Sequence, residues 1–212
     1  MCCKAFHTII YVPGNHEYFQ TQTKPNTNPD ATDRWFRRLP ILYNIYNFIF
    51  LNEGDTYTMN ENTVFVGATM WSPIKEHEWT LTQLNVSNHH RINYKKNWKW
   101  TPEVQTAVFE DHYYSMEYNL RQLTNVKVVA ISHYVPHLLL INEKFKGNPL
   151  NSSFFFPGEK LLEFADVWIY GHTHSVDNNK KFVNKCLCVS NPIGYPDEHS
   201  GLPTPWKTSI EI

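Results

Sequence analysis

The sequence is rich in histidine, a residue type that carries chemistry. Eleven of the 212 residues are histidine, and imidazole is both the commonest metal ligand in proteins and the usual acid–base group near neutral pH. Polar side chains suited to this chemistry follow apolar runs at three places: Asn15 and His16, His133, and His172 and His174. Imidazole nitrogens bind Zn, Fe, Mn and Ni, and an amide oxygen is a harder, uncharged ligand. The pattern indicates metal-assisted chemistry.

The spacing of His172 and His174 leaves two arrangements open. In an extended segment their side chains point the same way, whereas in a bent loop they could address two adjacent ions. Two ions roughly 3.5–4 Å apart form the usual clamp for phosphoester hydrolysis, in which one generates hydroxide and both neutralise phosphoryl charge. His16 is better placed as proton donor to the leaving oxygen, and Glu17 could orient its ring and raise its pKa.

The elements that must position these residues follow from the apolar pattern. Residues 8–12, 126–131 and 167–170 have the length and stop signals of buried strands. In sheets of α/β proteins, ligands lie beyond the carboxyl ends of the strands. Because each of the three runs directly precedes one group of polar residues, we expect all of these residues to meet at one rim of the sheet.

The remaining elements are shorter. Thr101 and Pro102 are a typical helix start, and the helix should reach about residue 122. A short helix is expected near 30–39, capped by Asp30 or Thr32, and another near 159–164. Residues 48–51, 56–59 and 63–69 predict an antiparallel meander, and residues 75–100 an irregular excursion. Closing strands are expected at 182–183, 187–190 and 208–212. The scattered residues His77, His112 and His199 are interpreted as surface residues.

Composition narrows the class of protein. Nineteen Lys and Arg against 20 Asp and Glu give a net charge of -1, so the chain lacks the broad basic surface that holds nucleic acid. No apolar run approaches the roughly 18 residues of a membrane helix, and no signal-peptide pattern opens the chain. Cys186 and Cys188 are expected to be buried thiols, with zinc or disulfide use as the alternative. We predict a cytoplasmic protein without a membrane partner, for which nucleic acid is at most a substrate.

The same residues carry a family resemblance. Gly14-Asn15-His16-Glu17, Ser132-His133 and Gly171-His172-Thr173-His174 resemble, in order, the third, fourth and fifth motifs of the calcineurin-like metallophosphoesterases. Residues 67–71 and 189–196 are similar to segments of small bacterial-type members. The resemblance implies an α+β or α/β fold in which two sheets form a sandwich flanked by helices. It also implies a hydrolase (phosphatase or phosphodiesterase) with a dinuclear metal centre that acts on a phosphoester substrate.

The resemblance also assigns roles to residues. Asn15, His133 and His172 would bind the second metal ion and His174 the first, while His16 would contact the scissile phosphate. Two of these residues have a plainer alternative: His133 could cap a strand, and Asn15 could form a turn with Gly14. Residues 88–92 resemble a family segment in which Arg91 could hold a substrate phosphate, although a structural role in an irregular loop is the favoured interpretation. His89 occupies the position of an aspartate in that segment.

One departure from the family pattern limits the predicted chemistry. The Asp-x-His and Gly-Asp-x-x-Asp motifs should precede Gly14, and neither occurs there; Gly54-Asp55 is better explained as a hairpin turn. Two divalent ions close together need negative ligands to offset their repulsion, and Asn15, His133, His172 and His174 are all neutral. We therefore expect one weakly bound ion or none, of Mn, Fe, Zn or Ni, where the complete family site holds two.

Three functions follow as expectations. The first is a metal-dependent phosphoesterase in which metal-activated hydroxide attacks a phosphomonoester or phosphodiester, with activity reduced by the absent carboxylates. The second is a catalytically inactive binding or interaction module on the same fold. The third is a mononuclear metal-binding protein. Residues 1–212 are expected to form a single domain that is N-terminally incomplete, with its first strands missing. The oligomeric state stays open.

Overall fold

The computed structural model describes residues 5–23, 27–96, 98–175 and 180–195. Its centre is a six-stranded sheet with the strand order β3-β4-β7-β8-β10-β9. The four inner strands run parallel, and an antiparallel strand closes each edge. The strands are β3 Asp55–Asn60, β4 Thr63–Ala68, β7 Lys127–Ser132, β8 Val167–Tyr170, β9 Lys180–Val183 and β10 Cys186–Val189. The predicted buried strands at 126–131 and 167–170 are confirmed as β7 and β8.

A second, two-stranded sheet lies against one face of the large sheet. β1 (Ile9–Tyr11) and β2 (Phe48–Phe50) pair in parallel, and α1 (Pro29–Tyr43) provides the crossover that parallel neighbours require. Apolar side chains from both sheets, among them Leu51 and Val129, form one cluster. The predicted arrangement of two packed sheets with helices outside is confirmed. The strand predicted at 8–12 is half-buried rather than buried.

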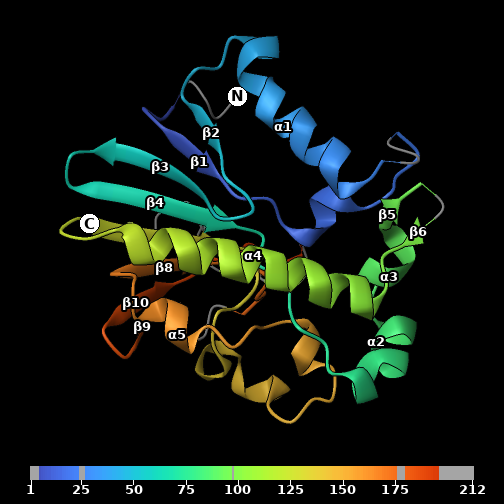
Figure 1. Ribbon diagram of the computed structural model, residues 1–212. Coiled ribbons are helices and arrows are strands. Elements are labelled where there is room, and N and C mark those ends of the chain that lie inside the picture. The colour runs from blue at the N-terminus through green and yellow to red at the C-terminus, as the bar shows by residue number, and fades with distance from the viewer. Residues whose placement is uncertain (1–4, 24–26, 97, 176–179, 196–212) are drawn as a thin grey trace.

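The helix α4 (Pro102–Gln122) covers the opposite face of the large sheet (Figure 1). Thr101 caps it as predicted, because its hydroxyl accepts a hydrogen bond from the backbone N–H of Val104 at 3.2 Å. The helix buries a stripe with helical spacing: Gln105, Phe109, His112, Met116 and Leu120. Because both faces of the large sheet are covered, its inner strands are apolar almost throughout, as parallel strands usually are. Cys186 and Cys188 are free, buried thiols in β10, as predicted.

His112 corrects the sequence-based interpretation. We predicted a surface residue, but its side chain is buried with 4% exposure. The physical reason is helical spacing, because His112 lies three residues after Phe109 and four before Met116, on the face that α4 turns to the core. His77 is exposed as predicted. His199 lies outside the described residues, and so does the strand expected at 208–212.

Two other expectations need correction. The helix near residue 30 begins earlier, because Asn28 caps it by accepting a hydrogen bond from the Ala31 N–H at 2.8 Å. The antiparallel meander is wrong in its first strand, since β2 pairs in parallel with β1, and of the three predicted strands only β3 and β4 pair as a hairpin. The turn at Glu53 and Gly54, both with positive φ, carries the chain from one sheet to the other.

Short elements lie around α4, with α2, α3, β5 and β6 at one of its ends and α5 toward the other (Figure 1). Residues 75–100 hold the 3-10 turn Glu76–Glu78, α2 Trp79–Asn85, α3 Asn88–Arg91, and the hairpin of β5 Asn93–Lys95 and β6 Trp98–Lys99. After β7 come the 3-10 turns Leu138–Leu140, Glu143–Phe145 and Asn151–Ser153, and then α5 Glu159–Leu162. In the described part of the chain, no helix has both the length and the apolar character needed to cross a bilayer.

Candidate metal centre

Three loops meet where β1, β7 and β8 end, as the strand pattern predicts. Asn15 opens the 3-10 turn Asn15–Tyr18 after β1, His133 follows β7, and His172 follows β8. The Nε2 atom of His133 lies 2.9 Å from Oδ1 of Asn15 and 3.0 Å from Nδ1 of His172. Residues separated by more than a hundred positions thus bring their donor atoms to one point, at the rim where such sheets bind ligands.

Two glycines allow this close approach. A Cβ atom added to Gly14 would lie 2.7 Å from Cε1 and 2.8 Å from Nδ1 of His133. A Cβ atom on Gly171 would lie 3.2 Å from Nδ1 of the same ring. The imidazole of His133 therefore packs between two backbone segments that only glycine lets so near. This explains, in physical terms, why a glycine stands before Asn15 and another before His172.

Asn88 holds the Asn15 amide in place. Asn15 donates from Nδ2 to Oδ1 of Asn88 at 2.8 Å, which leaves its Oδ1 facing His133. Asn88 in turn donates to the hydroxyl of Tyr134 at 2.9 Å. The sequence reasoning did not single out Asn88 or Tyr134 for this role. The available signal was the position of Asn88 at the start of the segment 88–92, which the family resemblance had already marked.

His172 adopts an unusual backbone conformation. Its φ is 59°, a left-handed value that costs energy outside glycine and that clusters at functional sites. Its ring stacks on Tyr134, with centroids 4.3 Å apart, and on Phe154 at 5.4 Å. The Nε2 atom is buried and has no hydrogen-bond partner among the described residues. The surrounding aromatic rings hold the imidazole with Nδ1 toward His133.

Burial keeps both central imidazoles neutral. It lowers the pKa of His133 to about 3, with smaller contributions from His16 and His174. Burial also lowers the pKa of His172 well below its usual value, and His133 and His174 act in the same direction. Neutral imidazole is the form that binds metal, because protonation removes the lone pair. At neutral pH the site therefore presents lone pairs rather than positive charge.

His16 lies at the same rim against an aromatic ring. It stacks on Phe19 with centroids 4.4 Å apart, and the guanidinium of Arg91 lies 4.6 Å from the centroid of that ring. Burial is the largest cause that lowers the pKa of His16; Glu17 raises it, whereas Arg91 and His174 lower it. The structure thus brings Arg91 within electrostatic reach of His16.

Glu17 and His174 lie close to this group in different ways. The Glu17 carboxylate accepts hydrogen bonds from the Tyr11 hydroxyl at 2.9 Å and from the Gly14 N–H at 2.8 Å, so it fixes the turn that carries His16. The ring of His174 contacts the edge of Tyr195, with centroids 4.6 Å apart. His174 is close enough to lower the pKa values of His16, His133 and His172.

The donor set suits a single borderline divalent ion. Neighbouring ligands, each about 2.1 Å from one ion, lie roughly 3.0 Å apart in octahedral geometry and roughly 3.4 Å apart in tetrahedral geometry, and the two donor distances around His133 Nε2 are 2.9 and 3.0 Å. Among the described residues, however, no group of three or more His, Cys, Asp or Glu side chains is arranged to hold a metal. The three donors that meet are thus two imidazoles and an amide, without a carboxylate to offset the charge of a second ion.

Comparison with known proteins adds a family and a fold. Residues 2–176 match the calcineurin-like phosphoesterase family. Uncharacterized protein L509 of Acanthamoeba polyphaga mimivirus is 27% identical over 210 residues, which cover 93% of this chain and 71% of that protein. Phosphopantetheinyl hydrolase (PptH) from Mycobacterium tuberculosis has a similar structure, with a TM-score of 0.66 and 15% identity, covering 95% of this chain and 74% of PptH. At that identity the likeness concerns the fold alone.

Proposed function

Because the chain belongs to the calcineurin-like phosphoesterase family, we propose that it is a metal-dependent phosphoesterase that hydrolyses a phosphomonoester or phosphodiester. The observation that carries the proposal is that Asn15, His133 and His172 meet at the sheet rim. Nε2 of His133 lies 2.9 Å from Oδ1 of Asn15 and 3.0 Å from Nδ1 of His172. Residues 1–212 are taken as one domain, and a cytoplasmic location stays a prediction.

Asn15, His133 and His172 would hold the ion, which can be Mn, Fe, Zn or Ni, and His174 would complete the set. A divalent ion at such a site supplies an activated water and neutralises charge on the phosphoryl oxygens. Oxygen and nitrogen donors from three separate loops require those loops to be fixed before the ion binds. The glycines beside His133 and the hydrogen bond from Asn15 to Asn88 provide that fixation.

Two side chains at the rim would act on the substrate. His16 would give its proton to the leaving oxygen, and Glu17 would support it by fixing the turn and by opposing the burial that lowers the pKa of the His16 ring. Arg91 would bind a phosphate oxygen, since guanidinium donors match phosphate in a fork. Its position beside Phe19 and within reach of His16 supports this role.

The neutral ligand set favours low activity over a fully active dinuclear enzyme. Without a carboxylate among the three donors, we expect one weakly held ion or none at ordinary metal concentrations. This same feature supports the alternative function, an inactive binding module or a mononuclear metal-binding protein on the same fold. Metal stoichiometry and turnover together separate these functions.

The test combines binding and activity. The purified chain is titrated with Mn²⁺, Fe²⁺, Ni²⁺ and Zn²⁺, and the loaded protein is assayed with bis(p-nitrophenyl) phosphate and p-nitrophenyl phosphate. We expect at most one weakly held ion per chain and slow, metal-dependent hydrolysis that the variant His172→Ala loses, while the exposed control His77→Ala retains both. One bound ion without turnover would favour the alternative. Metal binding unchanged in His172→Ala would contradict the site itself.

A further inference from the structure

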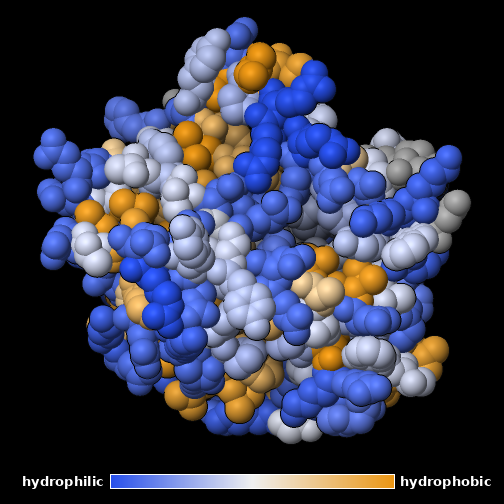
Figure 2. Space-filling model, in the orientation of Figure 1, coloured by the Kyte–Doolittle hydropathy of each residue, from blue (hydrophilic) through white to orange (hydrophobic). Residues whose placement is uncertain are grey.

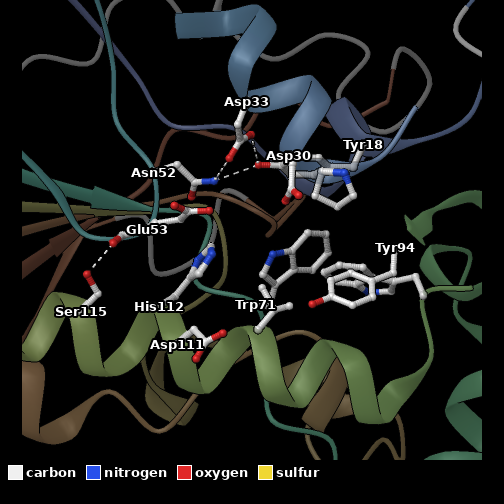
Figure 3. A pocket seen from close by; sticks show the side chains of 13 residues that line it. Tyr18, Asp30, Asp33, Asn52, Glu53, Trp71, Tyr94, Asp111, His112 and Ser115 are labelled. Atoms are coloured by element: carbon white, nitrogen blue, oxygen red, sulfur yellow. Dashed lines mark hydrogen bonds between the residues drawn. The ribbon is translucent and has the colours of Figure 1, made fainter. Parts of the chain in front are cut away.

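A separate cavity of about 370 Å³ lies between α1, α4 and the β5–β6 hairpin. Figure 3 shows Asp30 and Asp33 reaching down from α1, while Asp111 and His112 rise from α4. None of Asn15, His16, His133, His172 and His174 lines it. Hydrophilic side chains predominate between the two helices on the face in Figure 2. A cavity of this size suits a small ligand.

The walls of the cavity carry negative charge. Four carboxylates line it, those of Asp30, Asp33, Glu53 and Asp111, and no lysine or arginine is among the lining residues. Asp33 is buried, and it accepts hydrogen bonds from the Tyr18 hydroxyl at 2.8 Å and from Asn52 at 2.7 Å. A carboxylate has about four acceptor positions, so Asp33 retains capacity for another donor.

The carboxylates around the cavity repel one another electrostatically. Burial raises the pKa of Glu53, and the nearby charges of Asp33, Asp55 and Asp30 raise it further, while Arg37 lowers it. Arg37 itself pairs with Asp55 at 2.7 Å and does not line the cavity. A cation inside the cavity would relieve this repulsion.

His112 gives an independent indication of a ligand. Its side chain is 4% exposed, and its Nδ1 atom has no hydrogen-bond partner among the described residues. Leaving a buried polar atom unpaired is costly. Figure 3 shows the ring pointing up from α4 into the space between the two helices. Burial lowers the pKa of His112 to about 4. At neutral pH the ring therefore adds no positive charge, and one of its nitrogens can accept a hydrogen bond.

Aromatic side chains form the remaining wall. Trp71 and Trp100 lie with ring centroids 4.4 Å apart, and Tyr94 meets Trp100 edge-on at 6.0 Å. All three line the cavity. The negative face of an aromatic ring attracts cations, most strongly when the cation carries little bound water. Aromatic walls next to carboxylates therefore favour an organic cation over a strongly hydrated ion.

We propose that this cavity binds a small organic cation with an alkylammonium group. The ammonium would donate hydrogen bonds to Asp33 and to Nδ1 of His112, and the alkyl part would lie against Trp71 and Tyr94. A bare divalent ion is the less suitable occupant, since it holds its bound water strongly and the aromatic walls favour a cation that carries little water. This site lies beyond the phosphoester chemistry at the rim.

The test compares two probes of equal size and different charge. The full chain is titrated with 1,4-diaminobutane and with the neutral 1,4-butanediol, by calorimetry and by the fluorescence of the tryptophans beside the cavity. We expect saturable binding of the diamine alone, weakening as salt rises because exposed charges contribute to it. Equal responses to diamine and diol, no saturable diamine binding, or displacement of the diamine by equimolar Mg²⁺ would each overturn the proposal.

Variants locate the diamine within the molecule. Asp30 and Asp111 are exposed, so the double variant Asp30→Asn/Asp111→Asn should fold, and we expect it to weaken diamine binding roughly fivefold or more. His112→Phe removes the unpaired nitrogen and should also weaken binding. The control Glu110→Gln changes the exposed carboxylate next to Asp111 that does not line the cavity, and it should change binding less than twofold. A loss in the control equal to that in the double variant would mean that only net charge matters.

Discussion

The rim of the sheet and the cavity between α1 and α4 both have features that suit a cation, but for different physical reasons. The rim offers two neutral imidazoles and an amide oxygen, whose donor atoms lie 2.9 and 3.0 Å from Nε2 of the central His133. The cationic Arg91 is nearby. The cavity offers carboxylates, aromatic faces and a single unpaired imidazole nitrogen. Coordination by lone pairs depends on placement to a few tenths of an ångström, whereas charge attraction depends on the number of carboxylates. Placement should therefore govern the rim, and ionic strength should govern the cavity.

The largest expected effect comes from disturbing placement at the rim. In Gly14→Ala the added Cβ would meet the His133 ring at 2.7 Å, which ordinary van der Waals contact forbids, so the loop or the ring must shift. We expect metal binding at the rim to fall below detection, and the free energy of unfolding to fall by roughly 1–3 kcal/mol. Calorimetric metal titration and urea unfolding measure the two effects.

Gly147→Ala is the matched control for that variant. Gly147 has no atom within 4 Å of an added Cβ, although its φ of 77° makes the substitution mildly unfavourable. It should therefore cost some stability and leave metal binding unchanged. If Gly14→Ala bound metal as the unaltered chain does, the claim that placement governs the rim would be wrong.

A second variant tests placement without crowding. Asn88→Ala removes the acceptor that holds Nδ2 of Asn15, so the amide is free to turn its oxygen away from His133. Residues that orient a ligand typically change metal affinity by about 10–100-fold, and we expect a loss in that range. The control Asn85→Ala removes an exposed amide that donates to the Leu81 carbonyl in its own helix. Similar metal affinity in both variants would show that Asn88 does not orient Asn15.

The sequence predicted the rim better than the cavity, for a physical reason. The rim residues follow apolar strands, and parallel strands place their carboxyl ends together, so order along the chain translates into position. The cavity depends on how α1 packs over α4, and no local pattern records that packing. Even so, the burial of His112 could have been predicted, because its spacing to Phe109 and Met116 places it on the core face of the helix. The polar character of histidine suggested a surface position instead. The place of β2 in the second sheet was also missed, although the wholly apolar run 48–51 differs from the alternating run 56–59 in the way that a buried parallel strand differs from a hairpin strand.

His112 also predicts a pH dependence of stability on the cavity side. Burial lowers its folded-state pKa to about 4 from an ordinary 6.5. Between pH 6.5 and pH 4, His112 is protonated in the unfolded chain and neutral in the folded chain. Protonation therefore favours the unfolded state, and stability is lost as the pH falls toward 4. Between pH 7 and pH 5 this group should cost about 2 kcal/mol. Urea unfolding of the unaltered chain and of His112→Phe at both pH values measures the difference.

The exposed His77 supplies the control for that experiment. Because its side chain is 76% exposed, His77→Phe should change stability by a similar small amount at pH 7 and at pH 5. An equal pH dependence in the unaltered chain and in His112→Phe would show that other groups dominate, and that the buried ring is not the source of acid sensitivity.

The smallest effect concerns the fixed cation at the rim, which has no counterpart in the cavity lining. Arg91 lies over Phe19, and removing it in Arg91→Ala should weaken the binding of inorganic phosphate to the metal-loaded chain about fivefold. We expect Arg91→Lys to recover only part of this, because an ammonium has charge without the fork of donors. The control Arg121→Ala removes an arginine of α4 that lies in a similar way over the ring of Phe164, and phosphate affinity should not change. If both alanine variants lost phosphate affinity equally, Arg91 would act on phosphate through net charge alone. Its specific role would then be the structural one in the loop 88–92.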